Sequence, residues 1–380
     1  MRYQHDHLTQ AWNQDLESSR RGIWKHFSLL PLDGPERIIT LSEGDTPLAN
    51  ASALSRELGV KIFVKDETRN PTGSFKDRPN SVAISKALEL GAKTVAVASS
   101  GNAAGSLSAY AAKAGVACVV AVPEDTPQSK LGQIIVFGSR VTKVRGTYSD
   151  AFNLIKEACK TYGWHNLTSV ASANPYQVEG DKTVAYEICE QLSWNPPEWV
   201  IIPLGAGPLL VGAWKGFKEL HELGIIGKLP KMIGVQAEGC SPIVRAFKNG
   251  DSNVSAWEEP HTVAHSIADP LNGYPEDGSL TLKNIRESRG IAESVTDEEM
   301  VESVHLLART EGLFAEPSSA ATIAVIRKLR NSGNIRGDDI VVPVVTGTGL
   351  KSIATVNVLD VPEVDSGDIK SLSKIQDLKL

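Results

Sequence analysis

The chain has 380 residues, of which 41% are hydrophobic and 22% charged, the composition of a globular protein long enough for two domains. Its formal net charge is −6 and it has no concentrated basic run, which argues against nucleic acid or an anionic membrane surface as the main partner. No stretch approaches the roughly 18 to 20 apolar residues of a membrane-spanning helix, and the polar N-terminus lacks the apolar run of a signal peptide. The composition therefore favours an ordinary soluble globular protein.

The cysteines indicate the redox environment. There are four, far apart in the chain and without a Cys-x-x-Cys pair: Cys118, Cys159, Cys189 and Cys240. Isolated cysteines fit reduced thiols better than a zinc site or a disulfide framework. We therefore expect no metal site and a cytoplasmic location.

A lysine lies at a predicted junction between a turn and a helix. A strand over residues 60–65 leads into a Pro/Gly turn, and Ser74 is expected to cap the following helix. The apolar residues of that helix recur at helical spacing: Val82, Ile84 and Leu88. A partly buried lysine at a helix start, here Lys76, can have the lowered pKa that Schiff-base chemistry needs. From this segment alone, a solvated surface lysine is an equally good interpretation.

The rest of the chain alternates between short apolar runs and longer amphipathic stretches. Apolar runs rich in β-branched residues occupy 94–98, 117–122, 200–203, 232–235 and 340–345. An alanine-rich helix is expected over 103–114, and a polar loop over 249–260. This alternation is typical of parallel strands buried on both faces. We predict an α/β fold with mainly parallel sheets flanked by helices and a peripheral tail at 365–380.

The glycine-rich turn at residues 204–209 is a candidate phosphate cradle. It lies between a predicted strand and a helix expected over 211–223. Glycines let backbone amides approach a phosphate, and a helix N-terminus adds about half a positive charge. Pro208 has no N–H, so the predicted ligands are Gly205, Ala206, Gly207 and Leu209. A plain tight turn is the alternative interpretation.

A series of short motifs in a fixed order carries a family resemblance. The segment 71–78 is preceded by 43–48 and 64–67, and is followed by 99–102, 174–175 with 179–183, 205–207, 316–321 and 346–351. Together, over residues 23–355, they resemble threonine synthase, a fold type II pyridoxal-phosphate enzyme related to the tryptophan synthase β and threonine dehydratase enzymes. The resemblance implies two three-layer α/β/α domains with the cofactor between them. Residues 1–79 and 176–380 would form the large domain and residues 80–175 a smaller inserted one.

The resemblance also implies residue roles and a homodimer. Lys76 would carry pyridoxal 5′-phosphate, Asn102 would contact the phenolic oxygen of its ring, and Thr346 would face the ring nitrogen. A hydroxyl there supports less charge delocalisation than a carboxylate, which suits elimination from an α-carbanion. Phe75 would pack against the ring or in the core. The candidates for binding the amino-acid substrate are Ser99, Ser100, Asn174, Lys182 and His265.

The substrate-binding segments depart from the family pattern. Ala103, Ala104, Gln177 and Ser266 stand where threonine synthases carry threonine, serine and two arginines. At ~1.5 to 3 kcal/mol per charged hydrogen bond, these changes weaken a site for substrate phosphate. We predict a lyase acting on an amino acid, with threonine synthase, which converts O-phosphohomoserine to threonine and phosphate, as the first choice. The alternatives are a serine or threonine dehydratase-type ammonia-lyase, a β-replacement enzyme, or a non-catalytic cofactor-binding sensor.

Overall fold

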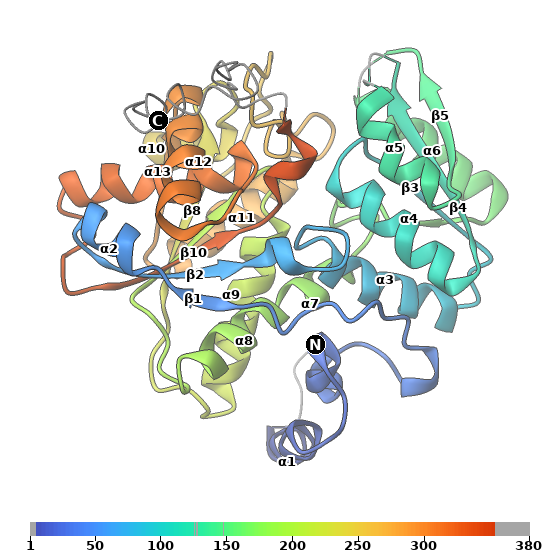
Figure 1. Cartoon of the computed structure of the whole chain (residues 1–380). Coiled ribbons are helices and arrows are strands. Elements are labelled where there is room, and N and C mark those ends of the chain that lie inside the picture. The colour runs from blue at the N-terminus through green and yellow to red at the C-terminus, as the bar shows by residue number, and fades with distance from the viewer. Residues whose placement is uncertain (1–4, 125, 127, 147, 354–380) are drawn as a thin grey trace, which may run out of the picture.

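Two sheets organise the chain in the computed structural model, which describes residues 5–124, 126, 128–146 and 148–353 (Figure 1). The larger sheet has the strand order β1-β2-β10-β7-β8-β9, and the smaller one has the order β5-β4-β3-β6. All neighbouring strands are parallel except the β1–β2 pair, which is antiparallel. The predicted α/β fold with mainly parallel sheets is therefore confirmed. The predicted domain boundaries at residues 80 and 175 stay a prediction.

The strands of the larger sheet are β1 (Leu48–Asn50), β2 (Lys61–Asp66), β7 (Trp199–Pro203), β8 (Lys231–Ala237), β9 (Ile291–Val295) and β10 (Ile340–Val345). Those of the smaller sheet are β3 (Thr94–Ala98), β4 (Ala117–Pro123), β5 (Arg140–Val144) and β6 (His165–Asn166). Central strands such as β7 and β10 are apolar along their whole length because helices cover both faces of the sheet.

The helices in the first half of the described chain are α1 (His5–Leu16), η1 (Gly22–Leu29), η2 (Pro35–Arg37), α2 (Ser52–Leu58), η3 (Glu67–Arg69), α3 (Asp77–Glu89), α4 (Asn102–Ala114), α5 (Gln128–Val136), α6 (Tyr148–Tyr162), α7 (Gln177–Asp181) and α8 (Thr183–Gln191). Those in the second half are α9 (Pro208–Glu222), α10 (Pro242–Asn249), α11 (Pro275–Glu287), α12 (Asp297–Glu311), α13 (Pro317–Asn331) and η4 (Gly349–Lys351). None of the helices in the described ranges is long and apolar enough to cross a membrane.

Strand β7 shows how the larger sheet separates two cores. Val200 and Ile202 point to one face, where they join a core that includes Phe217 of α9. Trp199 and Ile201 point to the other face and join the core that contains residues of α13. This alternation follows from the period of two in a strand. The larger half is thus a three-layer α/β/α arrangement, and β3 has a separate core with α4 and α5 in the smaller half.

Two predicted helix starts were wrong. Ser74 does not cap α3: the helix begins at Asp77, Lys76 occupies the cap position, and the Ser74 hydroxyl has no hydrogen-bond partner among the described residues. Helix α9 begins at Pro208 rather than Val211, because proline has the backbone angle of a first helical residue and needs no N–H there. The phosphate-cradle turn is therefore shorter than expected and runs directly into the helix.

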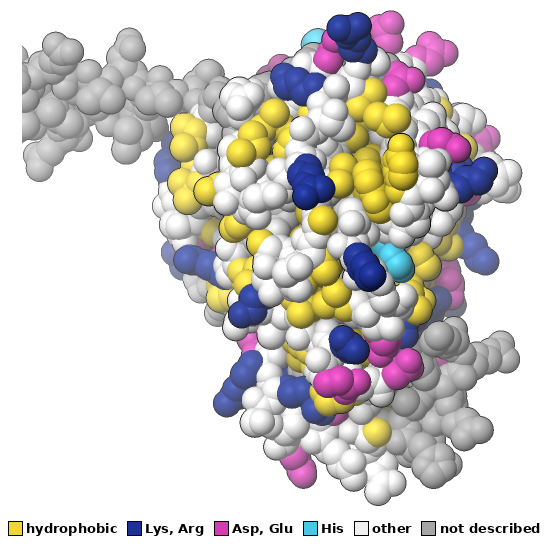
Figure 2. Space-filling model, turned by 90° about the vertical axis from the view of Figure 1, so that its right-hand side faces the viewer, with side chains coloured by type: hydrophobic (Ala, Val, Ile, Leu, Met, Phe, Trp, Pro, Cys, Tyr) yellow, Lys and Arg dark blue, Asp and Glu magenta, His cyan; other side chains and the backbone are white. Residues whose placement is uncertain are grey.

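The outer face of the smaller half carries exposed hydrophobic side chains. Figure 2 shows patches of them separated by single lysines and arginines. In the described ranges, Val136 at the end of α5 is the most exposed large hydrophobic residue, at 77%. Single exposed apolar residues are common, but grouped ones often mark contact surfaces.

Candidate active site

The turn that carries Lys76 is fixed to the end of strand β10. The Phe75 N–H donates to the Thr346 carbonyl at 2.9 Å, and the Thr348 N–H donates to the Gly73 carbonyl at 3.0 Å. Because β2 and β10 are parallel neighbours, the segments that follow them leave the sheet at the same edge. This is the edge at which ligands bind in open α/β sheets.

Lys76 lies in a partly buried position with few polar neighbours. Its Nζ donates to the Ser169 hydroxyl at 3.3 Å and lies 4.7 Å from the centre of the Phe75 ring. Burial lowers the pKa of Lys76, while the charges of Asp181 and Asp269 oppose that shift. A lowered pKa favours the neutral, nucleophilic form of the amine.

Asp181, at the end of α7, is a fully buried carboxyl group near Lys76. Neither of its oxygens has a hydrogen-bond partner among the described residues. Burial raises the pKa of Asp181 to about 7, although Lys76 and Arg78 act in the opposite direction and Glu67 in the same one. A carboxylate without donors is costly to bury, so this group changes charge near neutral pH.

We expect Asp181→Asn to stabilise the protein at high pH. The pKa of Asp181 is higher in the folded than in the unfolded state, so the wild-type protein loses part of its free energy of unfolding as the pH rises from about 4 through about 7. At about pH 8 the variant should gain ~2 to 4 kcal/mol in unfolding free energy over the wild type, and at low pH almost nothing. Urea unfolding of both proteins at acid and alkaline pH measures this difference. A gain that does not depend on pH would contradict it.

The turn between β7 and α9 fits a phosphate group. Gly207 has φ +92°, and a Cβ there would lie 2.5 Å from the Thr281 side chain, so the turn requires glycine. The Thr281 hydroxyl donates to the Ala206 carbonyl at 2.6 Å. The Asp269 carboxyl group interacts with the Ala206 N–H, so an oxygen acceptor lies at this amide. This amide, the glycines and the N-terminus of the 15-residue helix α9 form an anion cradle.

The side chains of Asn102 and Thr346 come from opposite halves of the molecule and lie near each other in the site. The Asn102 Nδ2 donates to the Glu316 carboxylate at 3.2 Å, and its Oδ1 accepts from Lys351 Nζ at 3.0 Å. The buried Thr346 hydroxyl lies 2.8 Å from that of Ser319. Asn102 is the first residue of α4, so its side chain points from the smaller half toward the end of β10.

The candidates for substrate binding have different surroundings. The hydroxyl of Ser99, which like Ser100 is half-buried, accepts from the Gly101 N–H at 3.2 Å. Asn174 is buried and its Oδ1 has no partner among the described residues, so it is available to a ligand. Lys182 is fully buried between Glu179 and Glu219, at 2.8 and 3.1 Å, and His265 is exposed. Because two carboxylates already hold the charge of Lys182, we do not include it in the site.

The structure adds residues that the sequence analysis missed. Asp181, Asp269, Ser169, Glu316 and Lys351 all surround Lys76 or Asn102. Asp181, Glu316 and Lys351 lie inside the motifs that carry the family resemblance, which was the available signal. Nothing in the local pattern distinguishes Asp269 or Ser169.

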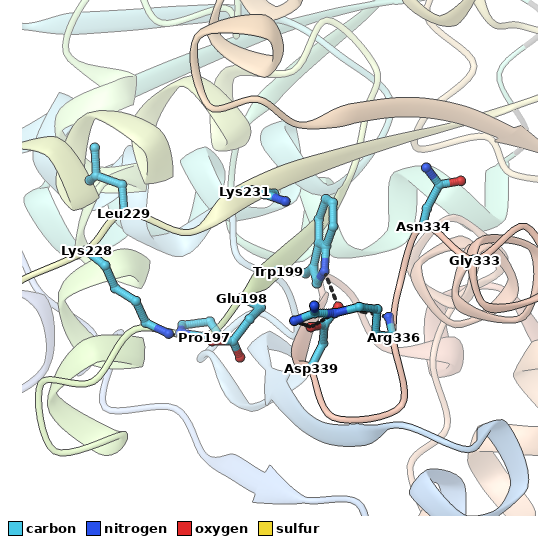
Figure 3. A pocket seen from close by; sticks show the side chains of 10 residues that line it. All are labelled: Pro197, Glu198, Trp199, Lys228, Leu229, Lys231, Gly333, Asn334, Arg336 and Asp339. Atoms are coloured by element: carbon cyan, nitrogen blue, oxygen red, sulfur yellow. Dashed lines mark hydrogen bonds and ion pairs between the residues drawn. The ribbon is translucent and has the colours of Figure 1, made fainter.

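A pocket of about 360 Å³ lies away from this site, at the edge of the larger sheet where β7, β8 and β10 begin (Figure 3). Four of its charges form two ion pairs, Lys228 with Glu198 and Arg336 with Asp339, and Lys231 lies over the Trp199 ring. Asp339 also accepts from the Trp199 indole at 2.9 Å. Because every one of these charges has a partner, the pocket offers less to a ligand than the Lys76 site.

The comparisons with known proteins agree with this geometry. Residues 39–347 match the sequence profile of the family described as "Pyridoxal-phosphate dependent enzyme", and the chain belongs to that family of lyase-type enzymes, with pyridoxal phosphate as its cofactor. Within it, the chain is 43% identical over 340 residues to the threonine synthase of Methanocaldococcus jannaschii, covering 89% of this chain and 82% of the relative. It is 41% identical to that of Methanosarcina acetivorans, covering 94% and 87%.

Solved structures show the same fold. The serine racemase of Dictyostelium discoideum superposes with a TM-score of 0.66 at 25% identity, covering 80% of this chain and 92% of that one. A processed threonine deaminase from Solanum lycopersicum gives a TM-score of 0.70 at 21% identity, covering 99% and 89%. The predicted family, cofactor and enzyme class are therefore confirmed.

Proposed function

We propose that this enzyme converts O-phosphohomoserine to threonine and phosphate. The observation that carries the proposal is the 43% identity to a threonine synthase over 340 residues, which is 89% of this chain. The buried lysine, the anion cradle and the hydroxyl of Thr346 support it, because they are the groups that pyridoxal phosphate chemistry at an amino acid requires.

The side chains have separate tasks in this proposal. The cradle at Gly205, Ala206, Gly207 and Leu209 would hold the cofactor phosphate, and Lys76 would hold its aldehyde carbon. When bound, pyridoxal phosphate supplies an electron sink for negative charge on the substrate α-carbon. Once the substrate amino group has displaced it, the released Lys76 amine would take the proton from the α-carbon, and burial, which lowers the pKa of Lys76, favours the neutral form that can do so. Thr346 offers only a hydroxyl to the ring nitrogen.

A second candidate function, elimination of ammonia or β-replacement on a hydroxyl-bearing amino acid, is favoured by the surroundings of Gln177. This residue is buried, and neither atom of its amide has a partner among the described residues. The nearby Asp181 carboxyl repels a dianion whenever it is ionised. Both features suit a small neutral leaving group better than a phosphate.

The test is phosphate release from O-phosphohomoserine by the cofactor-loaded protein, with threonine quantified in the same reaction. Equal amounts of phosphate and threonine support the proposal. Ammonia and keto acid from serine or threonine, without phosphate release, support the second function. Cofactor colour that does not change when any of these amino acids is added, with no product, would indicate the non-catalytic sensor.

We further propose a cytoplasmic homodimer whose smaller domain spans residues 80–175. The four cysteines form no disulfide, which fits a reducing compartment. Exposed hydrophobic residues on the smaller half, Val136 among them, support a surface that is covered in a dimer. Sedimentation of the loaded enzyme measures the mass of the assembly.

A further inference from the structure

The Asn102 side chain lies between two charged residues of the other half of the molecule. Lys351 at the end of η4 donates to its amide oxygen at 3.0 Å. Glu316, directly before α13, accepts from its amide nitrogen at 3.2 and 3.4 Å. Since α4 covers the smaller sheet and α13 the larger one, these three side chains form a polar link between the halves (Figure 1).

The charges on either side decide which way the amide points. An ammonium group has only donors, so it can meet the amide oxygen but not the amide nitrogen. A carboxylate has only acceptors, so it requires the NH₂ group. With Lys351 on one side and Glu316 on the other, only one of the two orientations of the Asn102 amide satisfies both partners.

This orientation turns the NH₂ group toward the end of β10. A Cβ added to Gly347 would lie 3.2 Å from Asn102 Nδ2 and 2.8 Å from Glu316 Oε1, so the NH₂ group lies directly against the residue that follows Thr346. A neutral N–H donor is what the proposed function needs at the phenolic oxygen of the cofactor. The reversed amide would present an acceptor to an oxygen that is itself an acceptor.

Lys351 also lies against the turn that carries Lys76. A Cβ on Gly73 would be 3.4 Å from Lys351 Cε and 3.8 Å from its Nζ. Burial lowers the pKa of Lys351, while Glu316 and Asp77 oppose that shift and favour its charged form. One lysine thus touches both the Lys76 turn and the Asn102 amide.

We propose that Lys351 is a positioning residue that orients the Asn102 amide toward the cofactor and joins the two halves of the molecule at the Lys76 turn. The role of Lys351 depends on the proposed function in one respect, which is that the Asn102 amide contacts the phenolic oxygen of the cofactor. The prediction concerns the cofactor and not the substrate, so it can be tested without turnover.

The experiment is a titration of the cofactor-free protein with pyridoxal phosphate, read by the affinity and by the visible absorbance band. Because a charge-assisted hydrogen bond is lost, Lys351→Met should weaken binding by about tenfold or more and shift the band in the same direction as Asn102→Ala. In a protein that already carries Asn102→Ala, adding Lys351→Met should cause almost no further change in the affinity or the absorbance band. Lys351→Arg keeps the donors and should restore most of the affinity. Lys86→Met, which removes a mostly buried lysine paired with Glu89, is the matched control.

Two results would overturn the proposal: an unchanged band and affinity in Lys351→Met, or effects of Lys351→Met and Asn102→Ala that simply add. Urea unfolding establishes that each variant is folded. If Lys351→Met is not, Lys351→Gln takes its place with the same expected direction. If wild-type enzyme forms no threonine but Lys351 and Asn102 remain coupled in the titration, the proposed function fails and this inference stands.

Discussion

Lys76→Ala is expected to lower the turnover number for threonine formation by about 10⁴-fold or more, because it removes both the base and the covalent attachment point. The neighbouring groups cannot replace it. Among the described residues, the Ser169 hydroxyl is the only group within hydrogen-bond distance of Lys76 Nζ, and a hydroxyl is a weak base. The measurement is steady-state phosphate release from the loaded variant, with threonine quantified.

Chemical rescue separates a lost amine from a damaged fold. The phosphate cradle and Thr346 are untouched in Lys76→Ala, so the variant should still bind pyridoxal phosphate. A small amine such as methylamine can occupy the space and take the proton from the α-carbon, and it should restore part of the rate. Lys86→Met, in the helix that follows the Lys76 turn but outside the site, should keep wild-type turnover. Equal rates for Lys76→Ala and wild type would remove Lys76 from the mechanism.

The regular parts of the fold were predictable because burial leaves a local pattern. Strands β3 and β10 agree with the predicted ranges 94–98 and 340–345 residue for residue, since both are continuous buried apolar runs. Strands β1, β5, β6 and β9 were missed. Segments of three and two residues, β1 and β6, carry no periodicity, and the five-residue strands β5 and β9 are only partly buried and contain polar residues, so they are not continuous apolar runs. Asn102 begins helix α4, and the structure adds the contact of its amide with Glu316 of the other half.

The environment of the site could not be predicted in the same way. Lys351 and Asn102 are 249 residues apart in the chain, and Lys76 and Ser169 are 93 apart. Such pairs form only when two sheets bring their strand ends together, and no local spacing reports that. The buried carboxyl of Asp181 is a similar case, because its raised pKa comes from burial that only the folded chain produces.

A buried cluster of charges directly below the Lys76 turn explains how that turn is held. Arg78 in the first turn of α3 pairs with Glu67 at 2.6 Å and with Glu187 of α8 at 2.7 Å. Lys65 of β2 also pairs with Glu187, at 2.7 Å. All four side chains are at most 1% exposed, and two positive charges balance two negative ones. The cluster therefore joins β2, η3, α3 and α8 without leaving a net charge inside the protein.

Arg78→Met should lower the free energy of unfolding by about 3 to 5 kcal/mol, because it leaves a buried carboxylate without its partner. Urea unfolding at neutral pH measures the loss. Arg69→Met is the matched control: Arg69 pairs with Asp66 at 3.0 Å, but its side chain is 67% exposed, so we expect less than about 1 kcal/mol. Glu187 keeps its pair with Lys65 in Arg78→Met, so adding Glu67→Gln removes the stranded charge and should recover part of the loss. Equal losses for Arg78→Met and Arg69→Met would show that the cluster does not hold the turn, and the rigidity of Lys76 would then need another cause.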